Sequence, residues 1–459
     1  MIDKRQDMLA SNKIGKLLFK LSMPAAVGMF VMTLYNVVDT IFIGHAVGFL
    51  GIAGLSIVFP VQMIIMGMGL MIGIGGASLI SRSLGARDTE KAERTLGNSL
   101  CLIIIVGLLI TSVGLSKSGF WVQFLGASDT ILPYAKGYMD IVLLGAVFQM
   151  FAMASGSMIR AEGNPMVPMK SMILGAILNI ALDAVFIIGL DMGVKGAAIA
   201  TVISVIAGTI YLISYYISKK SSLKIRLINL ILDRKITREI LAVGISDFVR
   251  STAMSIVTII LNRLLVFYGG DITVAGFGIL HRIMMFVMMP VISVAQGLQP
   301  VLGFNYGAKQ FGRALRAIKL STIVATLISV LAFLVLFFFP NPIIRIFTDD
   351  QALVSEASHA AKIVFLVVYL IGFQIIGTVI FQALGKAVPA FLLSASRQIL
   401  FLLPLLLILP RFFKLEGVFM AFPVADTLSF FLTLAFFIPQ VRELRIKDAL
   451  VKQKKLSDK

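Results

Sequence analysis

The chain has 459 residues, of which 58% are hydrophobic and only 14% are charged. A soluble protein of this size carries about a quarter charged residues, so the composition excludes a soluble globular protein. The net charge of +18 would suit a nucleic-acid binder, but the basic residues lie between apolar runs, where membrane topology explains them. The single cysteine, Cys101, excludes an intrachain disulfide and a cysteine-based metal site.

Apolar runs follow one another along nearly the whole chain, and each can cross about 30 Å of hydrocarbon at about 1.5 Å per residue. We predict an all-α polytopic membrane protein with twelve transmembrane helices. The polar residues Met1 to Lys16 lack the features of a cleaved signal peptide, so we expect none. The predicted spans are 17–45, 51–79, 95–116, 130–157, 166–190, 194–217, 239–268, 274–303, 317–340, 358–384, 388–412 and 416–440.

The basic residues predict the orientation of these spans. Most of the 41 Lys and Arg residues fall in alternate connections, in the first residues and after residue 440. The positive-inside rule therefore predicts that both termini lie in the cytoplasm. The short connections and the single cysteine fit a prokaryotic plasma membrane.

The sequence also predicts an internal duplication. Ala53-Gly54 matches Ala275-Gly276 and Gly85-Ala86-Arg87 matches Gly307-Ala308-Lys309, both at an offset of 222 residues. We predict two pseudo-symmetric six-helix bundles that share one orientation and form a V-shaped central cleft suited to alternating access. The expected domains are an N-lobe (1–218), a basic cytoplasmic linker (219–238), a C-lobe (239–445) and a basic cytoplasmic tail (446–459).

Polar residues gather at one depth of the predicted N-lobe. Asp39, Asp183, Thr201 and Tyr138 each lie roughly 10 Å below the outer surface, and Asn179 and Asn36 share helix faces with the two aspartates. An aspartate at such a depth costs roughly 2.5–3.5 kcal/mol on insertion scales, so it usually faces a cavity or a partner. Hard oxygen ligands suit a proton or Na⁺, whereas the alternative role is hydrogen bonding between helices.

Several motifs resemble the multidrug and toxic compound extrusion (MATE) family over essentially the whole chain. They are Tyr35-Asn36-x-x-Asp39-Thr40, Gly85-Ala86-Arg87, Arg160-Ala161-Glu162-Gly163-Asn164-Pro165 and Gln296-Gly297-Leu298-Gln299-Pro300 to Asn305-Tyr306-Gly307-Ala308. The resemblance implies a two-lobed cation antiporter that expels amphipathic organic cations. It implies cation ligands at Asp39, Asn179, Asp183 and Thr201, with Tyr35 and Tyr138 nearby and Asn36 in support.

The chain departs from another branch of this family, which places acidic residues in spans seven and ten. Asp247 lies near the inner end of span seven, and span ten has no acid, with Gln374 near the expected place. We therefore place the coupling site in the N-lobe.

The substrate cleft is predicted from fewer signals. Arg397 and Asp426 lie within spans eleven and twelve, where an interhelical ion pair or a share in substrate binding would accommodate both charges. Methionine side chains adapt to varied shapes, so a cluster of them suits promiscuous binding or simply fills a core. The candidate cleft residues are Met284, Met285, Met288, Gln296, Arg397 and Asp426.

The leading hypothesis is a secondary active multidrug exporter, an antiporter that exchanges drugs for H⁺ or Na⁺. The alternatives are a lipid-linked oligosaccharide flippase of the same superfamily and, from another class, an ion channel. We see no nucleophile or metal cluster that would make the chain an enzyme and no nucleotide-binding loop. We expect drug-like small molecules and lipid as partners, no cofactor beyond the coupling ion, no nucleic acid, and a monomer.

Overall fold

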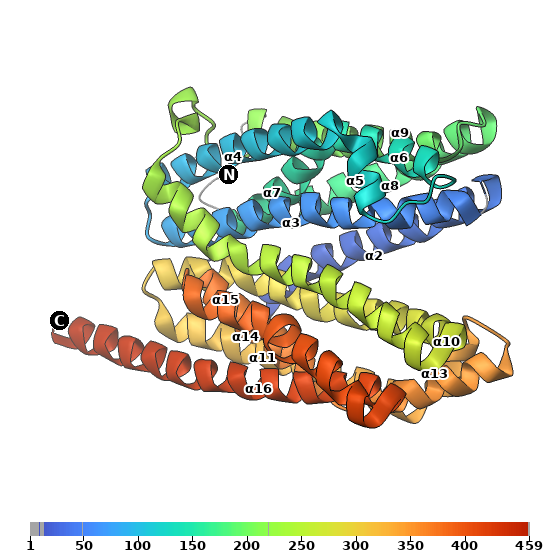
Figure 1. The fold of residues 1–459 in the computed structure, drawn as a ribbon. Helices are drawn as coiled ribbons and strands as arrows, with labels where there is room; N and C mark the ends of the chain where they lie inside the picture. The colour runs from blue at the N-terminus through green and yellow to red at the C-terminus, as the bar shows by residue number, and fades with distance from the viewer. Residues whose placement is uncertain (1–8, 10–12, 48, 219, 458–459) are drawn as a thin grey trace. The chain divides into compact units, whose positions relative to one another are not determined.

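The computed structural model describes residues 9, 13–47, 49–218 and 220–457. These residues form helices joined by short connections, and none of them lies in a β-strand (Figure 1). The elements are α2 (Ile14–Val47), α3 (Phe49–Gly85), α4 (Thr89–Ser116), α5 (Ser118–Phe124), α6 (Leu132–Leu144), α7 (Ala146–Ala161), α8 (Met166–Asp183), η1 (Ala184–Gly189), α9 (Gly193–Ile217), η2 (Leu227–Leu230), α10 (Arg234–Gly307), α11 (Phe311–Phe338), α12 (Pro340–Arg345), α13 (Gln351–Val364), η3 (Val368–Leu370), α14 (Ile371–Ala383), α15 (Ala387–Ala395), η4 (Ser396–Leu402) and α16 (Leu403–Ser457).

The described helices account for the twelve predicted spans. Eight helical stretches are long and apolar enough to cross a membrane, and two bent helix pairs, α6 with α7 and α13 with α14, raise the number to ten. Two of the eight stretches are far too long for one crossing, since about 20 residues suffice. Each is interrupted by a residue with non-helical backbone angles, Gly270 in α10 and Lys414 in α16. Dividing both stretches gives twelve spans among the described residues.

The backbone repeats itself at the predicted offset of 222 residues. Arg87 and Lys309 both adopt the left-handed conformation after a helix, with φ of 62° and 54°. The next amide closes the same turn in both halves, from Asp88 N to Ser83 O and from Gln310 N to Asn305 O, at 2.9 and 2.8 Å. Gly163 and Gly385 form a second such pair. Identical turns at corresponding positions confirm the duplication.

The chain forms two compact units. Unit 1 contains Met23–Phe248, and unit 2 contains the described residues of Ser11–Ser22 and of Val249–Lys459. The linker and the first turns of α10 therefore belong to unit 1, although the predicted N-lobe ends at residue 218. The first helix, α2, changes unit between Ser22 and Met23, next to Pro24 inside the helix. The predicted tail continues α16 in helical form to Ser457.

Unit 1 is organised around α3, which packs against α4, α6 and α7, while α8 packs against α9. Glycines bring its helices into backbone contact. A Cβ atom on Gly75 would lie 2.0 Å from the carbonyl oxygen of Ile240, and one on Gly244 would lie 1.8 Å from that of Met71. The start of α10 is therefore fixed against α3. Unit 2 buries one large apolar cluster among α10, α11, α13, α14 and α16.

Candidate cation site

Asp183 is a buried carboxylate of unit 1. It is the last residue of α8, directly before the π-helical turn η1, and it is fully buried. Neither of its carboxylate oxygens has a hydrogen-bond partner among the residues that the structure describes. Single π-helical turns inside α-helices often mark functional sites, and buried polar groups are normally paired. An unpaired carboxylate here calls for a bound proton or cation.

Asn179 lies one helical turn before Asp183 and is also buried. Within the described part of the chain, both its amide oxygen and its amide nitrogen lack partners. The i, i+4 spacing puts the two side chains on one face of α8. This face thus presents an amide oxygen and a carboxylate with free lone pairs, the ligands expected of a small-cation site.

Asp39 approaches this pair from α2. It is partly buried, and its Oδ1 atom has no partner among the described residues. Its charge lies close enough to Asp183 for the two to interact electrostatically. Tyr138 of α6 is buried and interacts with Asp39, Asp183 and Tyr35. The structure therefore brings Asp39, Asp183, Tyr35 and Tyr138 within electrostatic range of one another, and their role in ion binding stays a prediction.

Thr201 and Asn36 were also predicted to belong to this site. Thr201 lies half-buried on α9, which packs against both α8 and η1. The side chain of Asn36 lies outside the described residues.

The sequence interpretation missed Gln62 of α3, whose Nε2 atom donates to the Tyr138 hydroxyl at 3.0 Å. This hydrogen bond leaves the Tyr138 oxygen oriented by a partner from a third helix. An amide within an apolar span was a signal available in the sequence.

The cluster forms an acid pair that a positive charge would stabilise. Two ionised carboxylates removed from water repel each other, and each pays an effective desolvation cost of several kcal/mol. A proton on either group, or a cation shared between them, removes much of this cost. Among the described residues, no three His, Cys, Asp or Glu side chains gather as they would around a transition metal.

The corresponding positions of unit 2 are apolar. At an offset of 222, Asp39 corresponds to Leu261 and Asp183 to Leu405, and an offset of 223 gives Leu406 in place of Leu405. Leu261 and Leu406 are buried in the apolar cluster of unit 2, with Leu405 packed against it. At these corresponding positions, the duplicated scaffold thus carries aspartates in unit 1 and leucines in unit 2.

The predicted ion pair of unit 2 is confirmed. The Arg397 guanidinium contacts both carboxylate oxygens of Asp426: Nε donates to Oδ1, and Nη2 donates to Oδ2 at 3.2 Å. Arg397 lies in the π-helical turn η4. Gln374 of α14 donates to the backbone oxygen of Asp426 at 2.9 Å. Span ten therefore supports this pair through the side-chain amide of Gln374.

The other predicted cleft residues lie in the first half of unit 2. Met284 and Met288 pack against its apolar cluster, whereas Met285 is exposed. Gln296 is half-buried and makes a polar contact. A lining role for these residues stays a prediction.

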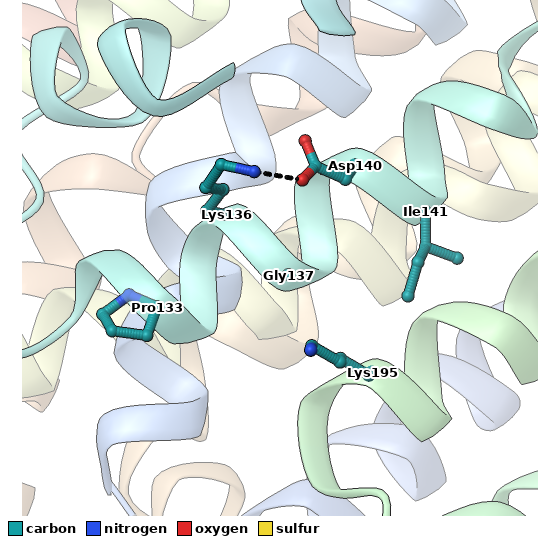
Figure 2. A pocket seen from close by; sticks show the side chains of 6 residues that line it. All are labelled: Pro133, Lys136, Gly137, Asp140, Ile141 and Lys195. Carbon is teal, nitrogen blue, oxygen red and sulfur yellow. Dashed lines mark hydrogen bonds and ion pairs between the residues drawn. The ribbon is translucent and has the colours of Figure 1, made fainter.

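A pocket of unit 1 is lined by residues of α6 and by Lys195 of α9 (Figure 2). Its volume is about 330 Å³, and its lining includes Lys136, Asp140 and Lys195. Lys136 pairs with Asp140 one turn later at 2.6 Å. Because this carboxylate already has a cation beside it, the pocket does not resemble the unpaired environment of Asp183.

The chain is similar in sequence and structure to known membrane transporters. The multidrug export protein MepA of Staphylococcus aureus (strain MRSA252) is 28% identical over 428 residues, which cover 93% of this chain and 94% of MepA. The solved structure of the MATE multidrug transporter DinF-BH in complex with a drug-like ligand is 45% identical with a TM-score of 0.87, covering 92% of this chain and 95% of that one. A transporter of the MOP superfamily from Pyrococcus furiosus is 27% identical with a TM-score of 0.89, covering 96% and 99%. The binding pocket of that transporter is described as reversed in polarity, which suggests a different function for it.

The MatE family model matches this chain twice, over residues 24–185 and 248–408. The two matches fall on corresponding parts of the duplicated halves, and the first one contains Asp39, Asn179 and Asp183. Together they cover more than half of the chain. The protein therefore belongs to the MatE family of membrane transporters.

Proposed function

We propose that this protein is a multidrug exporter of the plasma membrane that expels amphipathic organic cations in exchange for H⁺ or Na⁺. The observation that carries the proposal is the buried acidic cluster of unit 1, where Asp183 and Asn179 hold unpaired oxygens beside Asp39. The naming of MepA as a multidrug export protein and the drug-like ligand in the DinF-BH complex support the substrate class. In this proposal the coupling ion binds Asp39, Asn179, Asp183 and Thr201.

Exchange follows from competition for one set of negative charges. When the ion leaves, the two carboxylates need another positive charge, and an organic cation supplies it. When the ion returns from outside, it neutralises the cluster and weakens the hold on the drug. Pro24 offers a place for α2 to bend during this cycle, since it removes one helical hydrogen bond and crowds the preceding turn.

The orientation is part of the proposal. The basic linker and both termini lie in the cytoplasm, following the positive-inside rule. The cluster then lies toward the outer half of the membrane, where an ion from outside reaches it. A monomer suffices, because each chain carries both units.

Efflux of ethidium from proteoliposomes tests the function, with a pH gradient and a Na⁺ gradient imposed separately. We expect one gradient to drive efflux and Asp39→Asn to abolish it. The matched control is Asp140→Asn, which also neutralises an aspartate of unit 1 but one that already pairs with Lys136 at 2.6 Å. Efflux that survives Asp39→Asn, or that is lost equally in the control, contradicts the assignment.

A lipid-linked oligosaccharide flippase is the second candidate, since the superfamily includes a pocket described as reversed in polarity. A pyrophosphate-linked substrate needs cations to meet it, whereas the cluster of unit 1 is acidic. Absence of ethidium efflux under both gradients, with transfer of a pyrophosphate-linked lipid, would favour the flippase. Ion flux at channel rates without any drug would instead favour a channel.

A further inference from the structure

The linker between the two six-helix halves leaves large apolar side chains uncovered. Leu227, Ile228 and Ile231 are 85%, 71% and 71% exposed, in and next to the short helical turn η2. Neighbouring apolar side chains exposed to this extent mark an interaction surface. We propose that this turn, together with the cations beside it, is a membrane anchor that inserts into the cytoplasmic leaflet and binds anionic phospholipid. The inference goes beyond the transport function and uses only the proposed orientation.

The backbone of the turn is held against α4, so the apolar side chains cannot turn inward. Asn98 donates through Nδ2 to the carbonyl oxygens of Asn229 and Ile231, each at 3.2 Å. Its Oδ1 atom accepts from the amide of Asp233 at 2.7 Å. A Cβ atom on Gly97 would lie 2.2 Å from the carbonyl oxygen of Asn229. The linker thus lies directly on the helix backbone.

The start of the linker is fixed by two buried acids. Glu162 accepts hydrogen bonds from the Ser221 hydroxyl at 2.8 Å and from the Ser222 amide at 2.9 Å. Glu93 accepts from the Lys224 amide at 3.1 Å and lies 3.6 Å from the Arg226 guanidinium. These contacts fix the segment that leads into the apolar turn.

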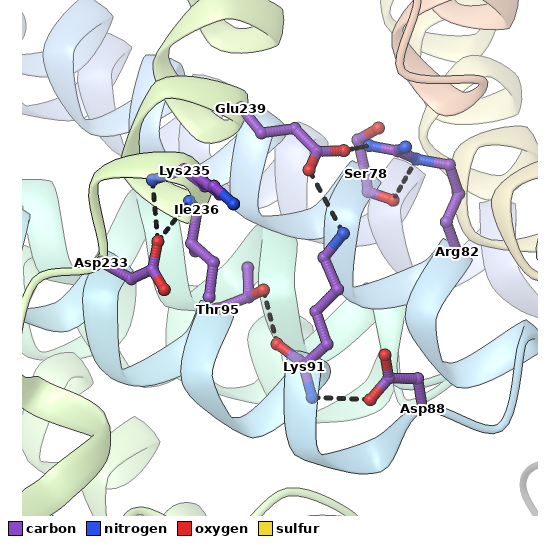
Figure 3. A network of polar contacts seen from close by, with 9 residues as sticks. All are labelled: Ser78, Arg82, Asp88, Lys91, Thr95, Asp233, Lys235, Ile236 and Glu239. Atoms are coloured by element: carbon purple, nitrogen blue, oxygen red, sulfur yellow. Dashed lines mark hydrogen bonds and ion pairs between the residues drawn. The ribbon is translucent and has the colours of Figure 1, made fainter.

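The end of the linker is fixed by a charged network (Figure 3). Glu239 of α10 pairs with Arg82 at 2.9 Å and with Lys91 at 3.4 Å. Asp233 caps the start of α10 by accepting from the amides of Lys235 and Ile236. The linker is therefore a docked part of unit 1 that presents η2 in one position.

The depth of the turn matches the edge of the hydrocarbon. Gly97 and Asn98 lie at the start of the third predicted span, and the same helix exposes apolar side chains from Ile104 onward. Seven residues of helix correspond to about 10 Å, so the turn lies at about the level of the lipid headgroups. Apolar side chains of interfacial segments insert about 5–10 Å into this region. A docking partner made of protein would have to compete with lipid at this level.

The charge of the linker is complementary to an anionic leaflet. Its exposed cations are Lys220, Lys224, Arg226, Arg234, Lys235 and Arg238. Asp233 is the one acid in the sequence from 219 to 238, and it caps α10. Clusters of Lys and Arg next to a membrane attract anionic lipid, and an apolar insertion beside them gives the second contact that stable anchoring requires.

The insertion is tested with a fluorescent label on the full chain in vesicles that contain phosphatidylglycerol. The only native cysteine is removed by Cys101→Ser, and the label is attached at Ile228→Cys. The matched control is Glu90→Cys, which lies seven residues before Gly97 on the same helix and thus about 10 Å closer to water. We expect brominated lipid to quench the label at 228 strongly and aqueous iodide to quench the label at 90. Equal iodide quenching at both sites overturns the proposal. The readout needs no transport, so a failure of the exporter hypothesis leaves it intact.

The lipid class is tested by the phosphatidylglycerol bound to purified protein, measured by native mass spectrometry against phosphatidylcholine. Each surface cation contributes about 1 kcal/mol to binding of anionic lipid, which corresponds to a factor of about five. We expect Lys224→Gln and Arg234→Gln each to lower the preference by up to this factor, while Lys117→Gln, outside the linker, leaves it unchanged. Equal preference in all variants overturns the lipid assignment. All three positions are exposed, and a monodisperse elution profile checks that the variants fold.

Discussion

Replacing Asp183 by asparagine tests whether this residue couples transport to the ion or only supports the structure. The substitution keeps the shape of the side chain and removes its ability to ionise. In the structure, Asp183 is fully buried, and neither oxygen has a partner in the described part of the chain. The ionised carboxylate therefore receives no stabilising hydrogen bond from the described residues, so replacing it by asparagine breaks no hydrogen bond among them. We expect ethidium efflux to fall to the level of protein-free vesicles.

The expected effect on stability is opposite in direction. Replacing an uncompensated buried ion by a neutral group removes its desolvation cost, which is on the order of several kcal/mol per ion, so the free energy of unfolding should stay constant or rise. The melting temperature in detergent should accordingly stay constant or rise by a few degrees. A structural hydrogen-bonding residue would behave differently, because its loss lowers the melting temperature.

Ion binding provides a second readout for the same variant. A ligand that binds only the folded state stabilises it by about 2.7 kcal/mol at a concentration one hundred times its Kd. We expect the coupling ion, added as Na⁺ or as acid, to raise the melting temperature of the unaltered protein and to have a smaller effect on Asp183→Asn. Full efflux in the variant would remove Asp183 from the mechanism. Loss of efflux together with a fall in melting temperature would make it a packing residue.

Three other substitutions test further parts of the structure. Burial raises the pKa of Glu162, in the connection between α7 and α8, and hydrogen bonds from Ser221 and Ser222 oppose that rise without cancelling it. The folded state therefore keeps the proton above the ordinary pKa of 4.5, so the free energy of unfolding should fall as pH rises from 4.5 through the raised pKa. Glu162→Gln removes this titration. Its melting temperature should therefore change less than that of the unaltered protein between about pH 4 and about pH 8. Arg397→Leu leaves Asp426 buried without its partner and should lower the free energy of unfolding by about 3–5 kcal/mol. Replacing both Arg397 and Asp426 by leucine should lower it much less. Equal melting temperatures of the single and double variants would contradict the ion pair. Gly97→Val should cost about 1–3 kcal/mol through overpacking and make the linker more sensitive to trypsin, unlike Gly119→Val, whose Cβ meets no atom within 4 Å.

The helices and their duplication could be predicted because both follow from local pattern. Apolar runs of sufficient length become spans, and the repeated Gly-Ala-Arg and Gly-Ala-Lys segments form the same left-handed turn at Arg87 and Lys309. The π-helical turns η1 and η4 could not be predicted, since nothing in the local spacing distinguishes them from α-helix. They depend on how each span packs against its neighbours.

The acidic cluster could be predicted because charge in hydrocarbon is rare and depth can be counted along a helix. This reasoning found Asp39 and Asp183, and it also found the pairing of Arg397 with Asp426. It missed Gln62, whose partner Tyr138 lies 76 residues away in the chain. It also missed the docking of the linker, because Asn98 looks like an ordinary residue at the start of a span until Asn229 and Asp233 are brought beside it.

The two halves show how one scaffold supports two different chemistries. The turns that end their helices are the same, so the duplicated backbone has been kept where it sets helix directions. The polar side chains inside each bundle differ: Asp39 and Asp183 have leucines at the corresponding positions, and Arg397 and Asp426 correspond to Gly175 and Ser204 at an offset of 222. An acid pair without a counter-ion changes state when a cation binds, whereas Asp426 already has Arg397 beside it. The ion that drives transport is therefore expected to act on unit 1, while Arg397 and Asp426 of unit 2 stay paired and hold α16 against η4.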